Sequence, residues 1–398
     1  MSDGNDLVQR ARGREAEIIR FLQDMVAFPS PSCQEGEVVA RIVEEMERVG
    51  FDEARVDGIG NAIGRVGDGP IHLLLDAHVD TVSVADPDLW TVDPYGGLVR
   101  DGCVYGRGTA DNEGAMASMV HGAALARELG LLDGVSLWVS GTVQEEDCDG
   151  LALQYLLENS GVPAQFVILG EATNLDVYRG HRGRCEYRID TTGVSCHASA
   201  PSRGVNALYR ASVAAVAVEQ LNERLADDAF LGKGTVAATF IECLTGSYNT
   251  VPDACSVYLD RRLTVGESPE SARREVADVL PEGADVIVLP YEATSHTGMK
   301  VSQPKEFPTW TLDPDHPLCR AGVRAAADIR GDQPALSRWV FSTNGVASMG
   351  RLGIPTIGFG PGEERFAHVA DERIPVEHLV QAAAFYAHVP SVLADTLR

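Results

Sequence analysis

The sequence predicts an α/β fold that is interrupted by a smaller α+β unit, and three observations support this. Short apolar runs typical of buried strands alternate with helical segments over residues 1–180. Over residues 181–297 the pattern changes to half-exposed strands with two helices. The first pattern then returns over residues 298–398. We therefore expect one larger domain built from the two outer segments, with the middle segment inserted into it.

The first segment begins with helical periodicity. Ile18, Leu22, Met25 and Val26 share one face of a helix expected over residues 6–28, which Pro29 ends. A second helix stops near Gly50, and a third covers about residues 113–129. The strands expected in this segment cover residues 54–56, 62–66, 71–75, 135–143 and 166–169.

The inserted segment starts with a half-exposed strand and a long Ala/Val-rich helix. Its expected elements are strands at 184–191, 234–242, 255–263 and 285–289 and helices at 205–225 and 269–280. The last segment is expected to supply helices at 316–329 and 376–388, a turn at 342–346 and a strand at 355–359.

Composition limits the partners of this chain. Its 398 residues are 44% hydrophobic, which is enough for a large core. The formal charge of −25 disfavours nucleic acid and anionic membranes. No apolar run reaches membrane-spanning length, and the start of the chain shows no signal peptide. We therefore expect a cytoplasmic protein, and in such a chain the eight cysteines, which lack zinc-type spacing, are expected to be reduced and mostly buried.

The first chemical signal follows the apolar run at 71–75. Ligands of open α/β sheets bind at the carboxyl ends of the strands, and His78 and Asp80 stand at such an end. On an extended chain both side chains point to the same side. A metal-binding imidazole usually has a carboxylate nearby that orients it, so this pair offers a ligand with its orienting group. An ordinary strand end with solvated polar residues is the alternative.

Carboxylates follow the neighbouring elements at similar places. Asp111 precedes a predicted helix, where it is either an N-cap or a functional carboxylate. Glu145 and Glu146 follow the strand at 135–143, and adjacent residues on an extended chain point in opposite directions. One glutamate can thus face a metal while the other faces substrate or water; a solvated acidic loop is the alternative. Glu171 follows the strand at 166–169.

Together with His368, these residues place two imidazoles and four carboxylates near one edge of the predicted sheet. Mixed nitrogen and oxygen ligands suit zinc, and less specifically manganese or cobalt. Five ligands with one shared carboxylate suffice for two metal ions, which leaves one glutamate as a base.

The motifs that carry these residues resemble the acetylornithine deacetylase / succinyl-diaminopimelate desuccinylase / glutamate carboxypeptidase superfamily of dinuclear zinc hydrolases. The resemblance covers nearly the whole chain. It rests on His78-Val-Asp80, Gly106-Arg-Gly-Thr-Ala-Asp111, Glu145-Glu146, Gly170-Glu171, Gly193 with His197, the block from Asn249 to Arg262, Gly353-Ile-Pro, and His368 with Asp371-Glu372. Segments such as Phe341-Ser-Thr-Asn-Gly are most similar to a subgroup of hydrolases linked by name to selenium metabolism.

The resemblance implies a zinc-aminopeptidase-like catalytic domain with a mixed central sheet and an inserted ferredoxin-like lid that forms a homodimer. It also implies a role for each matching residue. His78 and Glu171 would bind one metal ion, Glu146 and His368 the other, and Asp111 would bridge them. The remaining implied roles are orientation of His78 for Asp80, general base for Glu145, oxyanion stabilisation for His197, and substrate contact for Asn249 and Arg262. In dimeric relatives the histidine equivalent to His197 reaches the active site of the neighbouring subunit, and we expect the same here.

One departure concerns Asn344, Gly345 and Val346. Many relatives carry an acidic-x-Arg pattern there, so this chain lacks a basic side chain that could hold a substrate carboxylate. We still expect Asn344 and Gly345 to contact the substrate.

The function expected from these motifs is hydrolysis of an amide in a small N-acyl amino-acid-like substrate by a hydroxide held between two metal ions. A dipeptidase or carboxypeptidase with the same site is the close alternative. A metal-binding protein without catalysis is the third reading, but it predicts the loss of Glu145 or of a ligand, and all of them are present.

Overall fold

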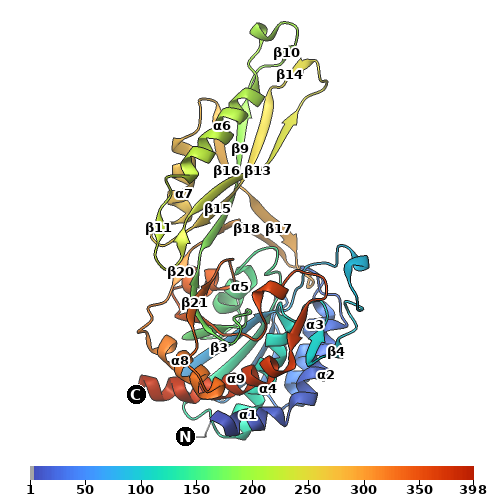
Figure 1. Cartoon of the computed structure of the whole chain (residues 1–398), viewed down its shortest axis with the longest axis vertical. Coiled ribbons are helices and arrows are strands. Elements are labelled where there is room, and N and C mark those ends of the chain that lie inside the picture. The colour runs from blue at the N-terminus through green and yellow to red at the C-terminus, as the bar shows by residue number, and fades with distance from the viewer. Residues whose placement is uncertain (1–3) are drawn as a thin grey trace.

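The structure is a computed structural model and describes residues 4–398 (Figure 1). Its larger part is built on a nine-stranded mixed sheet with the order β1-β2-β6-β3-β7-β22-β8-β20, in which β21 also pairs with β8. These strands are β1 (Glu53–Val56), β2 (Ala62–Val66), β3 (Ile71–His78), β6 (Val135–Thr142), β7 (Phe166–Leu169), β8 (Val177–His181), β20 (Trp310–Thr311), β21 (Leu336–Trp339) and β22 (Thr356–Gly358). The central strands β6, β3, β7 and β22 run parallel.

Side chains of the central strands alternate between two hydrophobic cores, because successive strand residues point to opposite faces. Leu73 and Leu75 of β3 join one core, and Leu74 joins the other. The helices on the first face are α1 (Gly4–Arg12), α2 (Glu15–Val26), α3 (Gly36–Arg48), α4 (Glu113–Glu128), α8 (Pro317–Arg330) and α9 (Val376–Leu397). Those on the second are α5 (Leu151–Asn159) and the π-helical turn η3 (Val346–Arg351). Both faces of the parallel strands are therefore covered, as their apolar runs require.

The middle of the chain forms a separate antiparallel sheet with the order β13-β15-β9-β16. Its strands are β9 (Gly183–Thr192), β13 (Thr235–Leu244), β15 (Ala254–Leu263) and β16 (Ala284–Val288), and its helices are α6 (Ala207–Asn222) and α7 (Pro269–Asp278). These helices share a hydrophobic core of their own with one face of the sheet. The βαββαβ order confirms the expected ferredoxin-like insert, which stands above the larger sheet in Figure 1.

The predicted boundaries at 180/181 and 297/298 stay predictions. β8 belongs to the larger sheet and β9 to the smaller one. The hairpin of β17 (Pro290–Thr294) with β18 (Lys300–Pro304) lies on both sides of the second boundary.

Some predicted elements differ from the structure. The single helix expected over 6–28 is two helices, because the helical conformation is interrupted at Gly13 and Arg14 between α1 and α2. The last helix continues through Pro390 to Leu397, because Val389, Val392 and Leu393 pack in the main core. Strand β8 and helix α5 were not predicted.

Candidate active site

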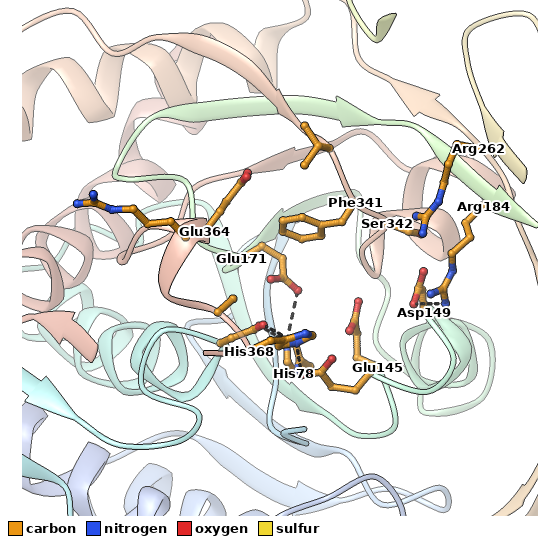
Figure 2. A pocket seen from close by; sticks show the side chains of 15 residues that line it. His78, Glu145, Asp149, Glu171, Arg184, Arg262, Phe341, Ser342, Glu364 and His368 are labelled. Atoms are coloured by element: carbon orange, nitrogen blue, oxygen red, sulfur yellow. Dashed lines mark hydrogen bonds and ion pairs between the residues drawn. The ribbon is translucent and has the colours of Figure 1, made fainter. Parts of the chain in front are cut away.

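A cavity of about 540 Å³ opens where β3, β6 and β7 end, between the larger sheet and the insert (Figure 2). All five predicted metal ligands and Glu145 line it. The full lining is His78, Asp111, Glu145, Glu146, Asp149, Glu171, Arg184, Arg262, Val340, Phe341, Ser342, Glu364, Arg365, Ala367 and His368.

Asp111 lies between the two imidazoles. Its Oδ1 is 2.8 Å from His78 Nε2, and its Oδ2 is 3.2 Å from His368 Nε2. His78 is the last residue of β3, whereas Asp111 lies just before α4 and His368 follows β22 in the chain. Each carboxylate oxygen thus faces a different imidazole, which is the arrangement a bridging ligand requires.

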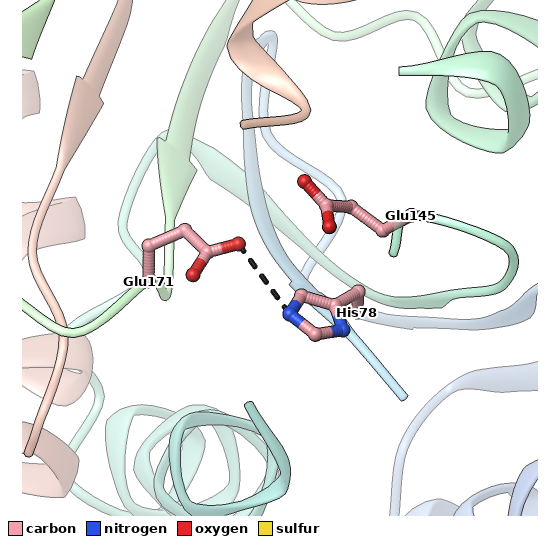
Figure 3. A group of neighbouring side chains, drawn as sticks. All are labelled: His78, Glu145 and Glu171. Atoms are coloured by element: carbon pink, nitrogen blue, oxygen red, sulfur yellow. Dashed lines mark ion pairs between the residues drawn. The ribbon is translucent and has the colours of Figure 1, made fainter. Parts of the chain in front are cut away.

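Each imidazole has a second carboxylate beside it. Glu146 Oε1 is 3.1 Å from His368 Nε2, and Glu171 Oε1 is 3.6 Å from His78 Nε2. Glu171 and Glu145 approach His78 from two sides (Figure 3). Potential ligand atoms of His78, Asp111 and Glu146 lie within 4.8 Å of one another, and so do those of His78, Glu145 and Glu171. The imidazole contacts join His78 with Glu171 and His368 with Glu146, in agreement with the pairs that the resemblance implies.

The crowding of carboxylates shifts their protonation. Burial raises the pKa of Glu171 to about 8, and the carboxylates of Asp111 and Glu146 act in the same direction. Burial also raises the pKa of Glu145 well above its ordinary value. Hydrogen bonds to Asp111 and Glu146 raise the pKa of His368 to about 10. Buried acids that are this close together are stable as anions only when positive charge lies beside them.

This donor set fits divalent metal ions. Imidazole nitrogens and carboxylate oxygens are common zinc ligands, and they also suit manganese and cobalt. Glu145 Oε1 is buried without a hydrogen-bond partner among the described residues, so it is free to accept a proton.

The orienting role implied for Asp80 stays a prediction, and the structure adds a main-chain contact to it. His78 Nδ1 donates to the main-chain oxygen of Asp80 at 2.8 Å, whereas the nearest carboxylate oxygen is 3.6 Å away. The Asp80 carboxylate instead accepts hydrogen bonds from Ser32 Oγ at 2.6 Å and from the amides of Glu145 and Glu146, each at 3.0 Å. Its side chain therefore holds the acidic turn, and its main chain orients His78.

Two further buried glutamates accept main-chain amides at or next to the acidic residues of the cavity. Glu35 accepts from the amide of Gln144 at 3.1 Å. Glu372 accepts from the amide of Asp111 at 3.1 Å and pairs with Arg107 at 2.5 Å. Glu372 lies in a motif that the sequence analysis quoted, but nothing in the sequence pattern singled out Glu35.

The three site residues predicted in the insert lie at opposite ends of it. Arg262 of β15 lines the cavity and pairs with Asp260. His197 and Asn249 are exposed and do not line the cavity. The strands beside them, β10 (Cys196–His197) and β14 (Thr250–Val251), lie at the end of the insert farthest from the large sheet (Figure 1).

Asn344 and Gly345 are buried in packing contacts, so the substrate contacts expected there stay a prediction that the structure does not support. Asn344 is only 3% exposed, and its amide nitrogen donates to Asp76 Oδ2 and Thr142 Oγ1 at 2.9 Å each. Its oxygen accepts from the amide of Gly150 at 2.9 Å. The Trp310 ring covers Gly345. Both residues are therefore used in packing, and neither lines the cavity, which Phe341 and Ser342 reach instead.

The sequence analysis also missed Asp149 and Arg184, which line the cavity beside Glu145. Among residues 4–398, no helix combines the length and apolarity needed to cross a membrane.

The chain is similar to known proteins along most of its length. The family model described as "Peptidase family M20/M25/M40" matches residues 74–391. The chain is 47% identical over 387 residues to the "Uncharacterized protein YgeY" of Escherichia coli (strain K12), and the match covers 96% of each. It is 25% identical over 390 residues to the succinyl-diaminopimelate desuccinylase of Dechloromonas aromatica, covering 93% of this chain and 97% of that one.

Solved structures share the fold. The Bacillus subtilis YXEP protein, described as a dinuclear metal-binding peptidase from the M20 family, superposes with a TM-score of 0.70 at 16% identity. That match covers 97% of this chain and 99% of the other.

Proposed function

The chain belongs to peptidase family M20/M25/M40 and is a hydrolase, and from this premise we propose that it cleaves an amide bond of a small N-acyl amino-acid-like substrate. The observation that supports the proposal best is the position of Asp111 between two imidazoles, each with its own glutamate. Glu145 lies beside this cluster without belonging to either pair. The arrangement suits two metal ions with a separate base.

In this proposal His78 and Glu171 hold one ion, His368 and Glu146 hold the other, and Asp111 is shared. Zinc is the expected metal, with cobalt or manganese as alternatives. When bound, two such ions supply Lewis acidity, which polarises the substrate carbonyl and makes water more acidic.

Glu145 is the proposed general base. Its carboxylate takes a proton from the attacking water and returns that proton to the leaving nitrogen. Asp80 keeps Glu145 in place through the main-chain amide.

His197 is proposed to stabilise the oxyanion in the active site of a second copy of the chain. It cannot serve the cavity of its own chain in this arrangement, because that cavity lies at the other end of the insert. The insert also exposes apolar side chains suited to a two-fold contact. On α6, Tyr209 is 70% exposed and Val213 56% exposed. On β13, which is an edge strand of its sheet, Phe240 and Ile241 are exposed. We propose a homodimer through this surface.

Activity of the metal-reconstituted enzyme against N-acyl amino acids, N-carbamoyl compounds and dipeptides tests the proposed function. We expect hydrolysis of N-acyl compounds and its loss on chelation. Preferential cleavage of dipeptides would favour a peptidase. An absence of turnover for every amide in a preparation that retains its metal would contradict the proposal.

A further inference from the structure

One wall of the cavity is built by the insert. Arg184 of β9 and Arg262 of β15 are direct cross-strand partners, so their side chains emerge side by side from one face of the sheet. Both line the cavity beyond Glu145 (Figure 2). Arg262 is paired with Asp260 through two hydrogen bonds of 2.7 and 2.9 Å. The wall therefore presents two guanidinium groups that are held in fixed positions.

Arg184 reaches across to the larger domain. Its NH2 donates to Asp149 Oδ1 at 3.1 Å, and its guanidinium lies 4.7 Å from the centre of the Phe307 ring. Asp149 is only 4% exposed and follows the acidic turn that carries Glu145. The Arg184–Asp149 pair thus joins the two domains at the edge of the catalytic cluster.

This pair has unused polar atoms. Arg184 Nε and Asp149 Oδ2 are both buried without a hydrogen-bond partner among the described residues. A buried donor or acceptor without a partner costs about 1–3 kcal/mol. A ligand that brings both an anionic and a cationic group would relieve both deficits after a small side-chain adjustment. A ligand with one sign of charge would relieve only one.

The charge of the wall also favours a ligand with both signs. Arg184 and Arg262 are paired with Asp149 and Asp260, and Glu186 lies 3.9 Å from Arg184, so the wall carries no excess of positive charge. A wall for a simple anion would carry excess positive charge, and the 344–346 turn supplies none. The wall lies next to Glu145, which donates to the leaving nitrogen in the proposed reaction. It is therefore placed to bind the amine half of the substrate.

We infer, on the basis of the proposed function, that this wall binds the free amino-acid end of a diamino acid whose side-chain nitrogen is acylated. The carboxylate of that end binds Arg184 and Arg262, and its ammonium group binds Asp149. A dipeptide or an Nα-acyl amino acid whose leaving half has one α-carbon has no such end, because its only α-nitrogen is the one in the scissile bond.

Binding of the amine products tests this without turnover. The probes are L-lysine, 6-aminohexanoate, which lacks the α-ammonium group, and 1,5-diaminopentane, which lacks the carboxylate. Titration calorimetry of the metal-loaded enzyme should show lysine binding at least about tenfold more tightly than either analogue. Arg184→Gln should remove the advantage over diaminopentane, and Asp149→Asn the advantage over 6-aminohexanoate. Arg274→Gln, on the exposed part of α7, is the matched control and should change neither.

Hydrolysis of four amides gives the second measurement. Three are the N-acetyl derivatives of the amines above, and the fourth is N-pentylacetamide, which lacks both the carboxylate and the ammonium group. We expect kcat/KM to be highest for Nε-acetyl-lysine and lowest for N-pentylacetamide. This ranking is measured on the wild-type enzyme, so the test does not depend on whether the variants fold. Equal rates for all four compounds, or equal binding of the three amines, would overturn the inference. Selective lysine binding without hydrolysis of any amide would instead contradict the proposed function and leave the binding wall standing.

Discussion

At the residue scale, buried carboxylates hold the acidic cluster of the cavity by main-chain amides within it or next to it. Asp80 accepts the amides of Glu145 and Glu146, Glu35 accepts the amide of Gln144, and Glu372 accepts the amide of Asp111. The side chains of Asp111, Glu145 and Glu146 are thereby left free to face the cavity. This layer explains how several acids keep their positions despite mutual repulsion.

Asp80→Asn tests this layer. An amide side chain presents an NH₂ group where the carboxylate accepted two main-chain donors, so the acidic turn should shift. We expect kcat to fall by about 10- to 100-fold, with weaker metal retention at the Glu146 site. Steady-state kinetics and elemental analysis measure the two effects. Ser32→Ala, which removes only one donor to Asp80, should cost much less; an unchanged kcat in Asp80→Asn would refute the role.

His181 predicts a pH dependence of stability that is separate from the metal site. Its Nδ1 donates to the main-chain oxygen of Arg182, and its Nε2 accepts from the amide of Thr343. Burial lowers the pKa of His181 to about 4. The unfolded chain therefore binds this proton more readily than the folded chain, and stability is lost as pH falls from 6.5 to about 4. The full difference corresponds to about 3 kcal/mol.

Urea unfolding of wild type and His181→Gln between pH 7 and 4.5 measures this contribution. The glutamine does not titrate, so the unfolding free energy of the variant should fall less steeply with decreasing pH. Carboxylates that titrate in the same range are common to both proteins and cancel in the comparison. Parallel curves for the two proteins would show that His181 does not titrate as its burial requires.

At the element scale, the ends of β3, β6 and β7 deliver His78, Glu145, Glu146 and Glu171 to one edge of the sheet. The sequence could predict this because long apolar runs mark buried parallel strands and their ends are visible as polar breaks. The sequence could not predict that Asn344 is buried by hydrogen bonds to Asp76 and Thr142, since these partners are distant from it in the chain. Arg184 was missed for the same reason: its partner Asp149 belongs to another domain.

The exposed face of α6 gives the prediction at this scale. Val213→Glu places a charge in the proposed dimer contact, so light scattering should show a monomer, and activity should fall because His197 would no longer reach a second site. Val56→Glu in β1 makes the same exchange at an exposed position of the larger domain and should change neither property. A fully active Val213→Glu dimer would place the contact elsewhere.

At the scale of the whole molecule, the sequence motifs predicted the fold and the family, both of which are confirmed. The metal ligands stay a prediction that the geometry supports, and so does the narrower resemblance to hydrolases linked to selenium metabolism. The resemblance predicted that His197 serves the neighbouring subunit, and its position at the remote end of the insert agrees with that prediction.

Mixing two inactive variants tests whether the active site is shared. His197→Ala and Glu145→Ala should each be nearly inactive. In a mixed dimer, purified with distinguishable tags, one site lacks both residues and the other is complete. We expect about half of the wild-type activity per dimer if the sites act independently. If His197 serves its own chain, each site carries one defect and no activity returns.

The most direct test of the central claim is the metal content of the gently purified chain, measured by elemental analysis alongside activity. The account predicts about two ions per chain in the wild type. Glu145→Gln should retain both ions but lose turnover, because only the base is removed, whereas Glu146→Gln should lose affinity at one site. Full activity with no more than trace metal, or near-normal turnover in Glu145→Gln, would contradict the account.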